Sequence, residues 1–167
     1  MLGHRVEVEY TKKVKESVIA FDEVCGAYDI ILHHYGPDRY LGSIHIEVDD
    51  RMTADQIDSL TRNITAKVYE ETGIYLTAIG IYSNNSSNEK LMKMRKDITE
   101  LVVDHKHILQ LHGFYVDEEQ KRITFDVVVD FDEEDREGLV KHIIEDVKEA
   151  LPEYDVRVAV DSDISDQ

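Results

Sequence analysis

The sequence contains an internal repeat, in which one pattern of apolar residues occurs twice at a spacing of 79 residues. The clearest matches pair Leu60 with Leu139, Ile64 with Ile143 and Val68 with Val147. The agreement extends over five successive predicted elements without a gap, which favours an old duplication over chance. A repeat of this kind limits the chain to folds that are built twice. We therefore expect two domains of one type, residues 1–83 and 89–167, joined by the polar segment 83–88.

Each half shows the same order of predicted elements, which is helix, strand, strand, helix, strand. Apolar residues three and four apart indicate the helices, and strict alternation, clearest in residues 43–48, indicates the strands. In the first half the expected helices are 11–24 and 54–71, and the expected strands are 27–34, 40–48 and 75–82. In the second half the expected helices are 89–103 and 134–151, and the expected strands are 107–115, 122–131 and 155–160. The predicted fold class is therefore α+β, a tandem repeat of two ferredoxin-like (metallochaperone-like) α-β-β-α-β sandwiches.

Charge and composition restrict the partners of this chain. The 36 Asp and Glu residues against 19 Lys and Arg residues give a formal net charge of −17, which repels nucleic acid and attracts cations. The single cysteine, Cys25, excludes an internal disulfide framework and a cysteine-based zinc cluster. The longest apolar run spans only residues 18–21, so we expect a soluble chain. We expect no nucleic-acid partner, and a divalent cation fits the charge better.

Catalytic templates are missing from the sequence, whereas metal-ligating residue types gather at the predicted hairpins. No G-x-S-x-G elbow, P-loop or H-E-x-x-H motif is present, so we do not expect an enzyme. His45 and Glu47 stand two apart on the polar face of one strand, so their side chains point the same way. The hairpin turn would bring either Tyr28 or Asp29 opposite His45. The candidate ligands of this half are His33, His34, His45, Asp29 and Glu47. The alternative is that these histidines are hydrogen-bonded surface residues or dimer contacts.

The C-terminal segment 161–166 is rich in aspartate and supplies two further candidate ligands, Asp161 and Asp163. Carboxylate oxygens suit hard cations, but the segment lacks the glycine and the distant glutamate of an EF-hand loop. A solvated acidic tail is the competing interpretation.

The hairpin carries a longer pattern than any of these pairs. Residues 28–39, Tyr-Asp-Ile-Ile-Leu-His-His-Tyr-Gly-Pro-Asp-Arg, are followed by residues 42–48, Gly-Ser-Ile-His-Ile-Glu-Val. Together they resemble the cytoplasmic C-terminal domain of cation diffusion facilitator transporters, which typically shows a His-Asp-Leu strand, a Tyr-Gly-Pro-Gly turn and a Ser-Val-His-Val-Glu-Val strand. Leu2-Gly3 resembles the segment that follows the last membrane helix there. The second half resembles, more loosely, the second copy in family members with a duplicated tail.

The resemblance implies a regulatory domain that forms a homodimer on the cytoplasmic side of the cell membrane, beneath a proton-coupled exporter of divalent cations. It implies zinc or manganese as the bound metal, near the dimer interface, and the membrane-spanning domain of the same transporter as a partner. Of the family's usual ligands His45 is retained, whereas Tyr28, Ala54 and the segment Gly80-Ile81-Tyr82 replace the others. Two other functions remain open, a free-standing tandem small-molecule-sensing module and a purely structural dimerisation domain without metal.

Overall fold

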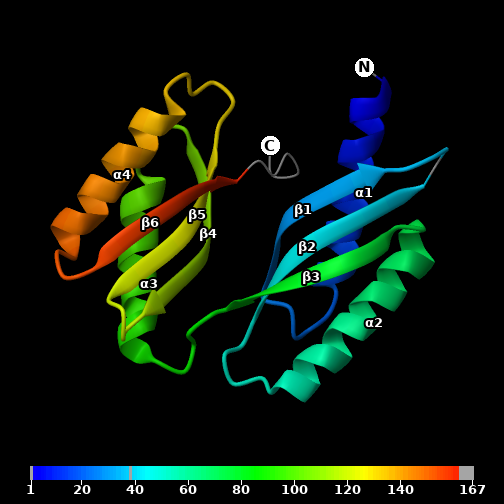
Figure 1. Ribbon diagram of the computed structural model, residues 1–167, viewed down its shortest axis with the longest axis horizontal. Helices are drawn as coiled ribbons and strands as arrows, with labels where there is room; N and C mark the ends of the chain where they lie inside the picture. Colours follow the sequence, from blue (N-terminus) through cyan, green and yellow to red (C-terminus); the bar gives the residue numbers. More distant parts are fainter. Residues whose placement is uncertain (1, 38, 162–167) are drawn as a thin grey trace. The chain divides into compact units, whose positions relative to one another are not determined.

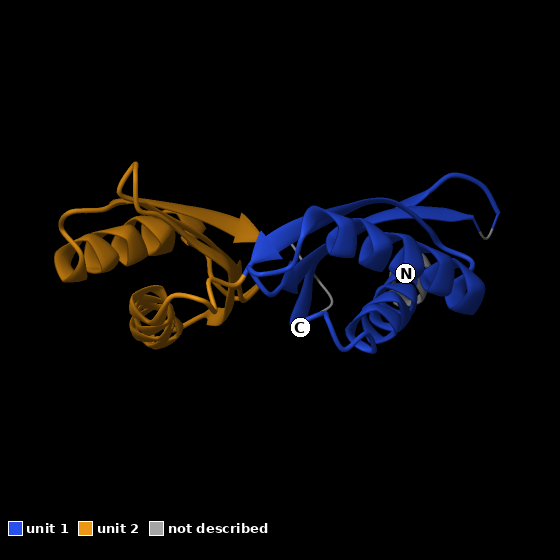
Figure 2. Ribbon diagram, turned by 90° about the horizontal axis from the view of Figure 1, so that it is seen from below, with its two compact units in different colours: residues 1–83, 163–166 blue, residues 84–162, 167 orange. Residues whose placement is uncertain are grey.

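The computed structural model describes residues 2–37 and 39–161, and it divides into two compact units between Ser83 and Asn84 (Figure 2). The first unit contains α1 (Leu2–Ile19), β1 (Gly26–His34), β2 (Tyr40–Val48), α2 (Ala54–Thr72) and β3 (Tyr75–Ser83). The second unit contains α3 (Glu89–Val103), β4 (Ile108–Asp117), β5 (Arg122–Val129), α4 (Arg136–Ala150) and β6 (Asp155–Asp161). Both have the α-β-β-α-β order (Figure 1), so the predicted fold class, two ferredoxin-like units in tandem, is confirmed.

Each unit is built on a three-stranded sheet with its middle strand contributed by the hairpin. In the first unit the strand order is β1-β2-β3, and in the second it is β4-β5-β6. The hairpin strands pair antiparallel, whereas the last strand of each unit runs parallel to the middle strand. A parallel pair needs a crossover connection, which α2 and α4 provide.

Each unit has its own hydrophobic core between its helices and one face of its sheet. In the first unit this core consists mainly of Val14 and Val18 of α1, Leu60, Ile64 and Val68 of α2, and Ile44, Ile46 and Val48 of β2. In the second unit it consists mainly of Met94, Ile98 and Val102 of α3, Ile143 and Val147 of α4, and Ile123, Phe125 and Val127 of β5. Because alternate residues of a strand face opposite sides, the residues between these core positions lie on the other face of each sheet.

Most predicted element bounds agree with the structure to within two residues, but the first helix differs more. It spans Leu2–Ile19 rather than residues 11–24, so the predicted start and end were both wrong. Its predicted end relied on the apolar residues Phe21 and Val24. These residues lie in two consecutive turns after the helix, where the amide of Phe21 donates to the carbonyl of Val18 and the amide of Val24 donates to that of Phe21. Within the described part of the chain, no helix is long and apolar enough to cross a bilayer.

Helix α2 begins and ends where the sequence predicts. Thr53 is its N-cap and forms a capping box with Gln56, in which each side chain bonds the other residue's backbone amide, at 3.3 Å and 2.9 Å. Gly73 ends the helix with φ of 73°, a left-handed conformation that glycine adopts without a steric cost. The two caps define where the crossover helix begins and ends before β3.

Replacing Thr53 with alanine should lower the free energy of unfolding of the first unit by about 1 kcal/mol, because one amide at the start of α2 loses its side-chain acceptor. Urea denaturation followed by circular dichroism would measure the change. Thr53→Ser, which keeps the hydroxyl, serves as the control and should retain most of the stability. An equal loss for both variants would contradict the capping role.

Candidate metal centres

The outer face of the first sheet, opposite the helices, presents His45. Its neighbours Ile44 and Ile46 are buried in the core, so alternation directs the His45 side chain to the other face. In the sheet, His45 pairs with Tyr28 on β1 and with Gly80 on β3. Of the two residues that the hairpin could bring opposite His45, the register selects Tyr28.

Asp29 reaches His45 because of an irregularity in β1. The pairing register shifts between Tyr28 and Ile31, and Asp29 there has φ of 54°, in the left-handed region that aspartate tolerates better than most residues. Its Oδ2 lies 3.1 Å from Nδ1 of His45, and the hydroxyl of Tyr82 donates a hydrogen bond to the same oxygen. Asp29 therefore contacts both His45 and Tyr82.

This arrangement fixes the orientation of the His45 imidazole. A carboxylate beside Nδ1 favours the tautomer in which Nδ1 carries the proton and Nε2 carries the lone pair. The ring also stacks on Tyr82, with centroids 4.7 Å apart and planes inclined by 16°. The His45 side chain is 42% exposed, so an ion from solvent can reach it. A histidine held by a carboxylate in this way is the usual form of a metal-ligating histidine.

Gly80 leaves the space that the His45 ring occupies. A Cβ atom built on Gly80 would overlap the ring at Cδ2 and Nε2. The sheet pairing explains this closeness, because His45 and Gly80 are neighbours on adjacent strands. The small residue on β3 therefore allows the stacked, ion-paired position of His45.

The other residues predicted as ligands are spread along the chain. His33 and His34 are exposed at the hairpin end of β1, where the ring of His34 lies 5.0 Å from that of Tyr40. Glu47 is 6% exposed and pairs with Tyr82 across the sheet. Among the described residues, no cluster of three metal-ligating atoms includes His33, His34 or Glu47.

The C-terminal candidates belong to the end of the second unit. Asp161 ends β6, and its Oδ2 lies 3.4 Å from Nε2 of the buried His112. His112 pairs with Asp126 on β5, and the distance between His112 Nε2 and Asp126 Oδ2 is 3.8 Å. Asp163 lies outside the described residues.

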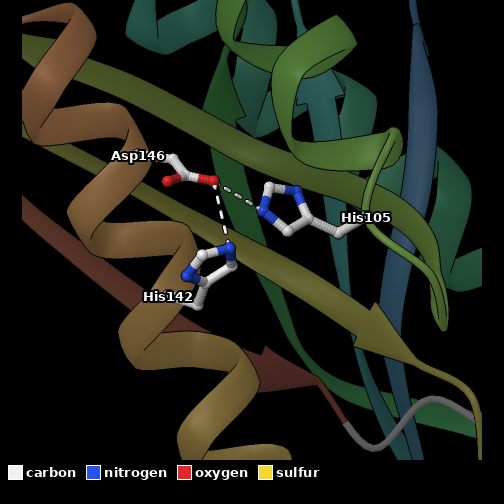
Figure 3. Close-up of side chains that lie close together, drawn as sticks. All are labelled: His105, His142 and Asp146. Carbon is white, nitrogen blue, oxygen red and sulfur yellow. Dashed lines mark hydrogen bonds and ion pairs between the residues drawn. The ribbon is translucent and has the colours of Figure 1, made fainter.

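A further cluster in the second unit was missed at the level of sequence. His142 and Asp146 lie one turn apart on α4, and His105 reaches them from the turn after α3 (Figure 3). Figure 3 shows both histidine rings directed at the Asp146 carboxylate. The sequence signal was the i, i+4 spacing of His142 and Asp146, which places both on one helix face. The third member, His105, could not be found from spacing.

Comparisons with known proteins find similarity in the first unit. Residues 6–79 match the family described as "Cation efflux protein, cytoplasmic domain". Among solved structures, the metal-bound C-terminal domain of the CzcD transporter from Thermotoga maritima is similar over 50% of this chain and 98% of that domain, with 19% identity and a TM-score of 0.45. A nickel form of a MamM C-terminal domain variant is similar over 46% and 94%, with 14% identity and a TM-score of 0.39. No curated protein sequence matches the chain.

Proposed function

We propose, from the match of residues 6–79 to the family of cation efflux protein cytoplasmic domains, that the chain regulates a divalent-cation efflux transporter. In this proposal it is the cytoplasmic dimerisation domain of a proton-coupled exporter of the zinc or manganese type. It binds a second copy of itself and acts on the membrane-spanning domain of the same transporter. It senses metal by binding it near the dimer interface and is not itself an enzyme.

The observation that carries this proposal is the pre-oriented His45 on an exposed sheet face. Asp29 holds Nδ1 of His45 at 3.1 Å, so Nε2 is the nitrogen suited to bind a cation such as Zn²⁺. In this role Asp29 positions the ligand and need not bind the metal itself. One imidazole is too few ligands for a tight site, because zinc usually takes four. A second copy of the sheet face would supply the remaining ligands.

Electrostatics supports coupling between metal binding and dimerisation. Each chain carries a formal charge of −17, so two copies repel each other. A divalent cation bound between two sheet faces reduces this repulsion and contributes bonds that only the closed dimer can form. Metal then shifts the population toward the closed dimer by its differential affinity for the two states.

The test measures whether metal drives dimerisation through His45. Sedimentation equilibrium of the metal-free chain, with and without Zn²⁺ or Mn²⁺, should show at least about tenfold tighter dimerisation with metal, within the usual range of coupling energies. His45→Ala should abolish this gain, because the oriented imidazole is lost. Ser43→Ala, two residues away on the same strand face, should keep it.

Three results would contradict parts of the proposal. Calorimetry that finds no metal binding tighter than millimolar would exclude the sensing role and leave a structural dimerisation domain. A small molecule that shifts the dimer equilibrium when metal does not would favour the small-molecule sensor. Unchanged metal-driven dimerisation in His45→Ala would place the metal elsewhere.

A further inference from the structure

We propose that the second unit has a divalent-cation site of its own, formed by His105, His142 and Asp146. This site lies between the turn that follows α3 and the helix α4 of the second unit (Figure 3). It does not depend on the proposed function, because it lies in the unit that the family match does not cover.

The distances fit a small cation with nitrogen and oxygen ligands. Oδ2 of Asp146 lies 2.8 Å from Nε2 of His105 and 3.6 Å from Nε2 of His142, and all three ligand atoms lie within 4.8 Å of one another. Ligands about 2.1 Å from a tetrahedral ion are roughly 3.4 Å apart, so small side-chain movements would enclose one. Two imidazoles and a carboxylate suit Zn²⁺, Co²⁺ or Ni²⁺ and leave a fourth position for water.

The hydrogen bonds of His105 favour the ring tautomer of a metal ligand. Nδ1 of His105 lies 3.1 Å from the carbonyl oxygen of Leu101 and 3.2 Å from that of Val102. Carbonyl oxygens only accept, so Nδ1 must carry a proton. In the neutral ring Nε2 then carries a lone pair, and it lies 2.8 Å from the Asp146 carboxylate, which also only accepts. A ring with one nitrogen donating to backbone carbonyls and the other facing the remaining ligands is the usual arrangement of a metal-ligating histidine, and a cation bound at Nε2 would also contact His142.

The two elements that supply the ligands are held in place by the core. His142 and Asp146 each precede a core residue, Ile143 and Val147, both of which are fully buried. His105 belongs to a turn in which its amide donates to the carbonyl of Val102 at 3.2 Å. The side chains are thus presented from rigid positions, as a pre-organised site requires.

The first unit has the same turn with different chemistry, and this provides an internal comparison. Phe21 lies three residues after the core residue Val18, as His105 lies three residues after Val102, and in both turns the amide of the later residue donates to the carbonyl of the earlier one. This correspondence is structural, because α1 and α3 end at Ile19 and Val103, whereas the 79-residue spacing would place His105 opposite Gly26. Ile64 and Val68 of α2 correspond to the core residues of α4, so Lys67 corresponds to Asp146.

In the first unit the side-chain ammonium of Lys67 occupies this position. Nζ of Lys67 lies 5.1 Å from the centre of the Phe21 ring, a cation–π contact. The second unit replaces the ammonium with the Asp146 carboxylate and the aromatic ring with the His105 imidazole. The place that an ammonium fills in one unit is therefore lined in the other by groups that bind a cation from solution.

The experiment titrates the full chain with Zn²⁺ by calorimetry and with Co²⁺ by visible absorption. His142→Asn introduces the residue found at the corresponding position of the first unit, Asn63. Because the His142 side chain is 62% exposed, this variant should fold normally. We expect it to lose one binding event or to weaken that event by about tenfold or more, since it removes a direct ligand. The histidine ring resonances of His105 should shift on Zn²⁺ addition in the parent chain only.

Matched controls separate a specific site from general attraction. Asp146→Asn should weaken cation binding at this site as His142→Asn does. Glu145→Gln removes the same charge from a neighbouring exposed position and should leave this binding unchanged. In His45→Ala the event should persist, so failure at the sheet face and failure here are distinguishable. The inference is overturned if His142→Asn binds as the parent does, or if Glu145→Gln weakens binding as much as Asp146→Asn.

Discussion

Phe125→Ala is expected to lower the free energy of unfolding of the second unit by about 3–5 kcal/mol, the usual cost of truncating a buried phenylalanine. Phe125 is 1% exposed in the middle strand β5 and stacks near Phe114, with ring centroids 6.3 Å apart. The truncation removes apolar contacts and leaves a cavity that a sheet and two helices cannot easily close. Because domains are stable by only about 5–15 kcal/mol, this loss should bring the second unit close to unfolding.

The consequence should be confined to one unit, because the two cores are made of different residues. Thermal unfolding followed by two-dimensional NMR should show the amide signals of residues 84–161 disappearing before those of the first unit. Phe131→Ala is the matched control, since Phe131 is 62% exposed, and it should cost less than about 1 kcal/mol. Simultaneous loss of both sets of signals would contradict the prediction that each unit is stabilised by its own core.

Much of the fold could be predicted because both units follow simple periodic rules. The alternation of apolar and polar residues predicted that β2 is a strand with one buried face. The repeat then predicted the same order of elements in the second half. The end of the first helix could not be found in this way. Phe21 and Val24 continue the apolar pattern of α1, but they face the core from hydrogen-bonded turns and not from a helix. An apolar pattern records burial, and burial does not determine the backbone conformation.

The candidate sites show a similar division between local and tertiary information. The outward direction of His45 follows from strand alternation alone. The contact between Asp29 and His45 depends on a register shift in β1, which alternation does not anticipate. The cluster on α4 depends on His105, which is brought to Asp146 only by the packing of α3 against α4. Only the tertiary structure therefore brings these three ligands together.

Gly80→Ala is expected to weaken metal binding at His45 by about tenfold or more, with little change in the stability of the first unit. A Cβ atom at this position would overlap the His45 ring, so the ring must rotate away. Rotation separates Nδ1 from Asp29 and breaks the stacking on Tyr82, and both contacts orient the ligand. The strand itself should tolerate the change, because glycine in a strand interior is unfavourable by roughly 0.5–1 kcal/mol relative to alanine.

A double-mutant cycle identifies the route of this effect, since residues in contact give non-additive changes. Zn²⁺ affinity would be measured by calorimetry for Gly80→Ala, His45→Ala and the double variant, each with the second-unit site removed by His142→Asn. If Gly80 acts only by leaving room for the imidazole, the double variant should bind no more weakly than His45→Ala alone. Additive losses would show that the glycine contributes to binding independently of His45. Unchanged affinity in Gly80→Ala would mean that the stacked, Asp29-held position of His45 is not the one that binds metal.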